Sequence, residues 1–236
     1  MTTTSPSRRE RLRTATVAEI KDAARRLLVT GGPSAISLRA IARDMGMTAP
    51  AIYRYFPGLD ALVGELCFDL YEELTAAIEA ARDRAGAPDP GERLRAMARG
   101  FRDWSLAHPA EFALMFASPV ASAEAPASDC DDADDPGVGL GDAFLAEFAR
   151  LWRAGQFPLP PPEQIGDDLA ERLGPFVAHH GSDLPLGVIY VFLTAWVRLY
   201  GLVAMEVFGQ LHWAMTDAEP LFEAEIAAFV RQLTGR

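Results

Sequence analysis

The segment from Ser37 to Phe56 constrains the fold of this chain more than any other part, and it reads SLRAIARDMGMTAPAIYRYF. Ser37 stands where a helix N-cap is expected. The apolar residues that follow keep the spacing of one helical face: Leu38, Ile41, Ala42 and Met45. Gly46 ends that helix, Thr48 can cap a second one, and Pro50 is tolerated in its first turn. The segment therefore predicts two helices that meet across a tight turn, as in a helix-turn-helix.

The second of these helices carries polar groups suited to DNA. Ile52 and Phe56 share one side at about 100° per residue, so we expect that side to be buried. Arg54 then faces outward between Tyr53 and Tyr55, whose hydroxyls would meet phosphates on the two walls of a major groove. A guanidinium can donate two hydrogen bonds to guanine, worth about 1–3 kcal/mol of discrimination. The candidate DNA-contacting residues are Ser37, Arg39, Thr48, Ala49, Pro50, Ala51, Tyr53, Arg54 and Tyr55.

Charge is distributed unevenly along the chain. The formal net charge is −11, yet residues 1–60 hold ten Lys and Arg against five Asp and Glu, which leaves −16 on the remainder. This asymmetry favours a basic DNA-reading domain joined to an acidic body. Arginines at positions 8, 9, 11 and 13 lie in a Ser/Thr-rich start, which predicts a flexible basic arm over residues 1–13. Both a minor-groove role and a merely solubilising role remain open for it.

These motifs resemble the N-terminal domain of the TetR family of repressors. The resemblance rests on the Ile41-Ala42 pair and on the Tyr53-Arg54-Tyr55-Phe56 ending, and it extends from about Thr16 to about Leu74. One position departs from the family pattern, which usually has Lys or Arg just after the Phe-Pro-x corner to bind a phosphate. This chain has Leu59 there. The resemblance implies double-stranded operator DNA as a partner, a homodimer, and release by a small-molecule effector.

The remaining sequence reads as helix after helix, so the predicted fold is all-α. Residues 14–60 form the three-helix DNA-binding domain, with a linking helix that starts near residue 59 and carries the domain to residue 74. Residues 75–236 form a helical ligand-binding and dimerisation domain. Residues 118–137 are rich in Ala, Ser, Pro and Asp, which predicts a flexible acidic loop. Its aspartates do not fit a calcium-binding frame, because Ala143 stands where the bidentate Glu belongs.

The longest apolar run, from Leu186 to Phe208, could span a bilayer by length alone. Arg198 near its centre and Glu206 argue instead for a buried helix of a soluble protein. A helix that is apolar nearly all round usually packs against a second subunit as well as its own core. We therefore expect a dimer interface that includes Leu193, Val197, Tyr200, Ala204, Phe208, Phe222, Ile226 and Phe229. The Trp196-x-x-x-Tyr200-Gly201 segment also resembles a subgroup pattern that ends in His-Gly.

The C-terminal part has enough aromatic residues to line an effector pocket. The candidate pocket residues are Trp104, Phe112, Met115, Phe116, Phe148, Trp152, Phe176, Tyr190, Trp196 and Arg198. Plain core packing is the alternative for the aromatic residues. For Arg198 and Glu206, the alternative to ligand contact is an ion pair with each other or across subunits.

The sequence thus favours a ligand-responsive transcriptional repressor that releases a palindromic operator when an apolar or amphipathic effector binds. The competing hypothesis is an α-helical enzyme for an apolar substrate, and a third is a peripheral membrane protein. The common nucleophile, metalloprotease and phosphate-loop motifs are missing, so we expect no catalysis. We also expect no cofactor, metal site or membrane partner. Two cysteines give no disulfide framework and no signal peptide opens the chain, which predicts a cytoplasmic protein.

Overall fold

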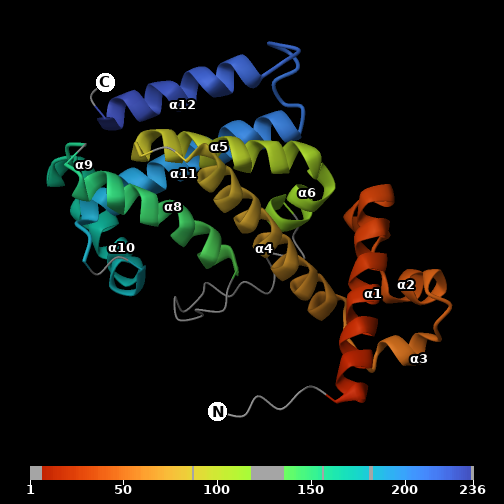
Figure 1. Ribbon diagram of the computed structural model, residues 1–236. Helices are drawn as coiled ribbons and strands as arrows, with labels where there is room; N and C mark the ends of the chain where they lie inside the picture. The colour runs from red at the N-terminus through yellow and green to blue at the C-terminus, as the bar shows by residue number, and fades with distance from the viewer. Residues whose placement is uncertain (1–6, 87, 118–135, 156, 181–182, 235–236) are drawn as a thin grey trace. The chain divides into compact units, whose positions relative to one another are not determined.

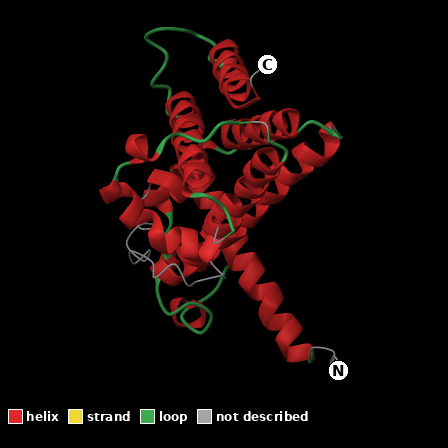
Figure 2. Ribbon diagram, turned by 90° about the vertical axis from the view of Figure 1, so that its left-hand side faces the viewer, coloured by secondary structure: helices red, strands yellow, loops and turns green. Residues whose placement is uncertain are grey.

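The computed structural model describes residues 7–86, 88–117, 136–155, 157–180 and 183–234. Within these ranges every regular element is a helix, as Figure 2 shows. The predicted all-α fold is therefore confirmed. The chain divides into two compact units, residues 1–70 with 110–126 and residues 71–109 with 127–236.

The first unit is built around α1 (Arg8–Gly31), α2 (Leu38–Asp44) and α3 (Ala49–Ile52), and Figure 1 shows α2 beside α1. A short 3₁₀ helix, Pro33–Ala35, joins α1 to α2. Ile20, Ile41 and Ile52 contribute one fully buried side chain from each α-helix. Between α2 and α3 the backbone turns at Gly46, whose φ of 64° is one that residues with a Cβ rarely adopt.

Helix α1 begins earlier than the sequence predicted. The Ser7 hydroxyl accepts a hydrogen bond from the Glu10 amide at 3.2 Å, and the Glu10 carboxylate accepts one from the Ser7 amide at 2.6 Å. This capping box satisfies two N–H groups that a helix start otherwise leaves unpaired. The hydrogen bonds from Ser7 hold the pKa of Glu10 below its usual value. The predicted flexible arm is therefore wrong from Arg8 onward, and its residues 1–6 lie outside the described residues.

The first unit also includes the start of α4 (Leu59–Ala85) and most of α6 (Pro109–Ala117). Arg25 donates a hydrogen bond from Nε to Oε1 of Glu111 at 3.0 Å, and the Glu111 carboxylate is almost fully buried. This pair joins α1 to α6 inside the unit. Helix α4 continues without a break from the first unit into the second, which agrees with the predicted linking helix.

In the second unit, α5 (Pro90–Ala107) is the helix around which the others pack. It contacts α8 (Pro136–Arg153), α11 (Leu186–Val207) and α12 (Glu219–Thr234). Two further helices, α9 (Pro162–Ile165) and α10 (Asp167–His180), pack against α11. Of the predicted acidic loop, residues 118–135 lie outside the described residues, whereas Pro136 and Gly137 already belong to α8.

Three arginines of α5 each form a two-point ion pair with a different helix. Arg93 contacts Glu147 of α8, with N–O distances of 3.0 and 2.7 Å. Arg99 contacts Glu223 of α12, at 2.6 Å for both N–O pairs. Arg102 contacts Glu206 of α11, at 2.8 and 2.6 Å. Because paired N–H donors match a carboxylate in only a few orientations, these contacts fix the angular position of each helix on α5.

Helix α11 is long and apolar enough to cross a membrane by length and composition alone, and only 28% of its most apolar window is buried. A single helix of this kind is weak evidence for a membrane span, since core helices meet the same criteria. Here α11 packs against α5, α8, α10 and α12 of its own unit. Its uncovered side exposes three large apolar side chains, Val197, Met205 and Phe208, together with Thr194 and Arg198.

We predict that Arg93→Ala destabilises the protein far more than Arg99→Ala. Glu147 is completely buried, so loss of Arg93 leaves a buried carboxylate without its closest cation. The remaining cation, on Arg150, lies 3.6 Å away. We expect this loss to cost about 3 kcal/mol of unfolding free energy. Glu223 is one-third exposed, and loss of Arg99 costs less than about 1 kcal/mol. Urea denaturation followed by circular dichroism measures both costs. Equal costs would mean that burial of the carboxylate does not decide the effect.

Candidate nucleic-acid interface and effector pocket

The start of α2 is fixed by its cap. Ser37 has extended backbone angles, φ −152° and ψ 146°, and its hydroxyl accepts a hydrogen bond from the Ala40 amide at 3.1 Å. The predicted Ser37 cap is confirmed. Thr48 occupies the matching position before α3, yet its side chain makes no capping hydrogen bond there. Thr48 is exposed. Because its hydroxyl makes no capping bond, contact with a phosphate would cost no cap.

The second helix of the motif is shorter than predicted, because α3 ends at Ile52 and the chain continues as a tight turn. The Arg54 amide donates to the Ala51 carbonyl at 3.3 Å, and the Tyr55 amide donates to Ile52 at 2.8 Å. These i to i−3 bonds are of the 3₁₀ type, which commonly tightens a last turn. Pro57 follows, and a proline disfavours helical geometry in the residue before it.

Two buried side chains hold this turn at its ends. Ile52 is fully buried and Phe56 is 4% exposed, as the predicted buried side requires. Between them Tyr53 is 56% exposed and Arg54 is also exposed, while Tyr55 is half-buried. The side chains suited to DNA therefore project from a turn whose backbone is anchored in the core.

All nine candidate DNA-contacting residues lie on α2, on α3 or beside these helices, and each is exposed or half-buried. Arg39 and Arg43 are exposed on α2, which adds positive charge to the same motif. Leu59, where the family pattern has a basic residue, is half-buried as the first residue of α4. Leu59 has no charge to offer a phosphate, so that contact would have to come from a cation elsewhere on the unit.

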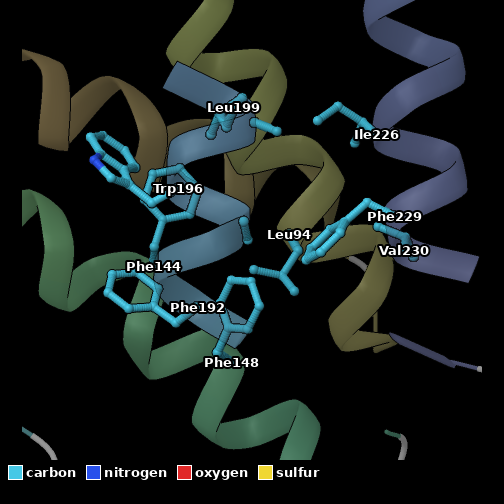
Figure 3. A pocket seen from close by; sticks show the side chains of 11 residues that line it. Leu94, Phe144, Phe148, Phe192, Trp196, Leu199, Ile226, Phe229 and Val230 are labelled. Carbon is cyan, nitrogen blue, oxygen red and sulfur yellow. The ribbon is translucent and has the colours of Figure 1, made fainter. Parts of the chain in front are cut away.

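The second unit has a partly open apolar cavity of about 40 Å³ between α5, α8, α11 and α12. Figure 3 shows Phe144 and Phe148 from α8 facing Phe192 and Trp196 from α11, with Phe229 of α12 closing another side. Ligand pockets are usually about 300–1,000 Å³. This cavity is therefore too small for an ordinary effector unless its aromatic walls move.

Only two of the predicted pocket residues, Phe148 and Trp196, line this cavity. Phe176 lies behind the wall and stacks on Phe192, with ring centroids 6.5 Å apart. The Arg198 guanidinium lies over the Phe229 ring at 5.4 Å. The sequence analysis missed Phe144, Phe192 and Phe229 as lining residues, although all three lie on apolar helical stripes.

The other predicted pocket residues lie elsewhere. The Trp104 indole donates a hydrogen bond to Glu73 at 3.0 Å and stacks on His108. Trp152 is half-buried on α8 and does not line the cavity. Phe112, Met115 and Phe116 belong to the first unit, so they are not part of this cavity.

A larger groove of about 460 Å³ opens beside the cavity. Its walls are residues 157–161 and three helices, which contribute Gln164 from α9, Tyr190 and Thr194 from α11, and Phe229 and Gln232 from α12. Phe229 lines both the groove and the apolar cavity. The predicted pocket residue Tyr190 therefore belongs to this outer groove, which offers hydroxyl and amide groups beside apolar surface.

The candidate dimer residues divide into two groups. Val197 is 69% exposed and Phe208 is 40% exposed, and the rest of the α11 set is half-buried: Leu193, Tyr200 and Ala204. On α12, Phe222 and Ile226 are buried inside their own unit, so the structure contradicts their assignment to a surface interface. Both turn inward because α12 packs against α5 and α11 through that side. Phe229 lines the cavity and the groove, as described above.

The Arg198 to Glu206 ion pair that the sequence left open is not formed within the chain. Glu206 is held by Arg102, whose guanidinium also lies 5.2 Å from the Phe222 ring centre. The hydrogen bonds to Glu206 raise the pKa of Arg102 above its usual value. Arg198 is exposed beside Phe229 instead.

The side chains that could bind a metal ion are scattered over the described part of the chain. No group of three or more His, Cys, Asp and Glu side chains gathers there in a way that could hold a metal ion. Burial raises the pKa of the Cys67 thiol to about 11, so it is a protonated core residue at neutral pH. Cys130 lies outside the described residues.

Comparison with known protein families gives two matches. Residues 20–66 match the model described as "Bacterial regulatory proteins, tetR family". Residues 94–229, more than half of the chain, match "Tetracyclin repressor-like, C-terminal domain". The two matches cover the helix-turn-helix and most of the unit that contains the cavity.

Individual proteins agree with these matches. The HTH-type transcriptional regulators Rv1816 of Mycobacterium tuberculosis and Mb1846 of Mycobacterium bovis are each 32% identical to this chain over 220 residues. Each alignment covers 92% of this chain and 91% of the relative. The crystal structure of SCO4313, named as a regulatory protein, is also 32% identical and superposes with a TM-score of 0.73. That superposition covers 95% of this chain and 98% of the other.

We predict that Ser37→Ala destabilises the first unit by about 1 kcal/mol, because the Ala40 amide loses its hydrogen-bond acceptor at the start of α2. Thr48→Ala is the matched control and should change the free energy of unfolding little, since Thr48 makes no capping bond. Chemical denaturation of both variants measures the difference. A larger loss for Thr48→Ala would contradict the assigned capping roles.

Proposed function

This chain belongs to the tetR family of bacterial regulatory proteins, and from that premise we propose that it represses transcription as a dimer bound to a palindromic operator and leaves the DNA when a small molecule binds. It is a transcriptional regulator with a helix-turn-helix DNA-binding domain. The observation that carries the proposal is the exposed turn from Tyr53 to Tyr55, anchored by buried Ile52 and Phe56.

For operator recognition, we assign the base contact to Arg54. Its side chain is exposed at the centre of the turn and is long enough to reach base edges from a motif seated in the major groove. Tyr53, exposed beside it, would donate its hydroxyl hydrogen to a phosphate. Arg39 and Ser37 would position α2 against the backbone of the duplex.

For the dimer, the supporting observation is that α11 leaves three large apolar side chains exposed on one side. These are Val197, Met205 and Phe208, and their spacing places them on one helical face. A two-fold axis through a self-complementary face would pair this side with its own copy. Two recognition motifs would then address half-sites about 34–36 Å apart.

For the effector, the adjoining cavity and groove support an amphipathic small molecule. The cavity offers only apolar walls, while the groove adds Thr194, Gln164 and Gln232. The neutral lining of both favours an uncharged ligand with an aromatic or aliphatic part. Binding would act on DNA affinity through α4, which runs as one helix through both units. To empty an occupied operator, the ligand must prefer the released state by several kcal/mol.

An enzymatic role is the alternative class, and the relatives give it no support because they are named as transcriptional regulators. A cytoplasmic location follows from the proposed role at DNA. The cytoplasmic location is part of the proposal, and the enzymatic role is its alternative.

The first prediction from this function concerns DNA. We expect fluorescence anisotropy to detect tight, salt-sensitive binding to a duplex selected from a random-sequence library, with a two-fold symmetric footprint. Arg54→Ala should weaken binding by about 1–3 kcal/mol and relax the preference at one base pair of each half-site. Tyr53→Phe should weaken selected and random duplexes alike. If the wild-type protein enriches no sequence from the library, the repressor proposal is wrong.

The second prediction concerns the dimer. Val197→Asp should shift the protein from dimer to monomer in analytical ultracentrifugation, because it places a charge in the proposed interface without disturbing the core. Leu169→Asp, on the exposed side of α10, is the control for a charge on a similarly apolar surface position and should leave the dimer intact. Dimers that persist in Val197→Asp would exclude the α11 interface.

A further inference from the structure

Arg13 of α1 contacts the exposed recognition turn. It lies on the second turn of α1, and the capping box at Ser7 and Glu10 makes this part of the chain helical. Its position is therefore set by a helix, whereas a flexible arm would leave it variable. Arg13 is therefore not part of a disordered basic tail, and its role need not be the one expected for such a tail.

Two contacts join Arg13 to the turn. The guanidinium lies over the Tyr55 ring, with its central carbon 5.6 Å from the ring centre. Nη1 also donates a hydrogen bond to the Arg54 carbonyl oxygen at 3.4 Å. Both contacts span 41 or more residues of sequence, and both lie inside the first unit. A cation over an aromatic face is attracted by the negative potential of the ring.

The turn is anchored at its two ends by the buried side chains of Ile52 and Phe56. Helix α3 contributes only four residues, and the backbone after Ile52 is held by the short-range bonds of Arg54, Tyr55 and Phe56 to the preceding carbonyls. The carbonyl of Arg54 is one of those that a helix end leaves without an intrahelical donor. Arg13 supplies a donor to this carbonyl and a cation to the neighbouring ring. It thereby restricts the backbone from which the Arg54 side chain projects.

We propose that Arg13 is a positioning residue for DNA recognition: it holds the Arg54 carbonyl and the Tyr55 ring so that the Arg54 side chain is directed toward the base edges. This inference rests on the proposed DNA-binding function. It differs from a direct phosphate contact by Arg13, because a guanidinium engaged with the turn acts on specificity, whereas one engaged with phosphate acts on every sequence.

The test compares Arg13→Ala with Arg9→Ala. Arg9 lies one helical turn earlier on the same face of α1, so both variants lose one positive charge from the same region. Binding is measured by anisotropy over a salt series with the library-selected duplex and with a random duplex. Arg13→Ala should weaken the selected duplex by about three- to tenfold and leave the random duplex and the salt slope unchanged. Arg9→Ala should not reduce the preference for the selected duplex.

A double-mutant cycle tests the path through Arg54. If Arg13 acts by directing Arg54, then adding Arg13→Ala to Arg54→Ala should cause no further loss of affinity. A salt slope that falls by about 0.9, together with equal losses on both duplexes, would assign Arg13 to a phosphate and overturn the proposal. A full additional loss in the Arg54→Ala background would overturn it as well.

Amide hydrogen exchange tests the contact without DNA. In the free protein, Arg13→Ala should speed exchange at residues 54–56, whose amides donate the bonds of the turn, and Arg9→Ala should not. Unchanged exchange in Arg13→Ala would show that Arg13 does not hold the turn. This measurement decides on the positioning role even if wild-type protein binds no duplex, a result that would refute the DNA-binding proposal by itself.

Discussion

The ion pair between Arg93 and the fully buried Glu147 is the contact on which the second unit depends most. Its charges are costly to remove from water, so the pair adds less to net stability than its short distances suggest. Its effect is specificity: a two-point geometry permits one register of α8 on α5. Arg99 and Arg102 impose the same restriction on α12 and α11. The cavity walls therefore have defined positions, although the residues that line them are all apolar and could pack in other ways.

The same restriction explains why α11 is incompletely buried. Arg102 draws the Glu206 side of the helix toward α5, and Phe192 and Leu199 turn toward the cavity. The opposite side, with Val197 and Met205, is then left facing outward. An apolar side that is exposed in one copy costs solubility unless another surface covers it. The ion pair on the inner side of α11 thus determines which side of the helix is left exposed.

The sequence predicts the features of this structure that depend on neighbouring residues, and it does not predict those that depend on contacts between distant helices. The helix-turn-helix was predictable because its cap at Ser37, its turn at Gly46 and its buried Ile52 are local signals. The prediction of a flexible arm is wrong from Arg8 onward, because a Ser/Thr-rich composition indicates flexibility whereas Ser7 and Glu10 form a capping box that starts a helix. The cavity lining could not be predicted, because periodicity shows which side of a helix is apolar and not which helix that side meets. Phe222 and Ile226 were assigned to an interface for this reason, although their own core buries them.

The small size of the cavity bears on how a ligand could release DNA. A ligand that bound the DNA-bound and the released states with equal affinity would shift no equilibrium between them. A cavity of about 40 Å³ cannot accept an ordinary effector without displacing Phe229, Trp196 or their neighbours. Those rings are carried by α11 and α12, which the α5 arginines hold in register. A proposed effector that entered this cavity from the adjoining groove would either break that register or move the helices together, and the displaced state would then bind it better. Under the proposed function, the small apolar cavity would in this way give a ligand the differential affinity that release requires.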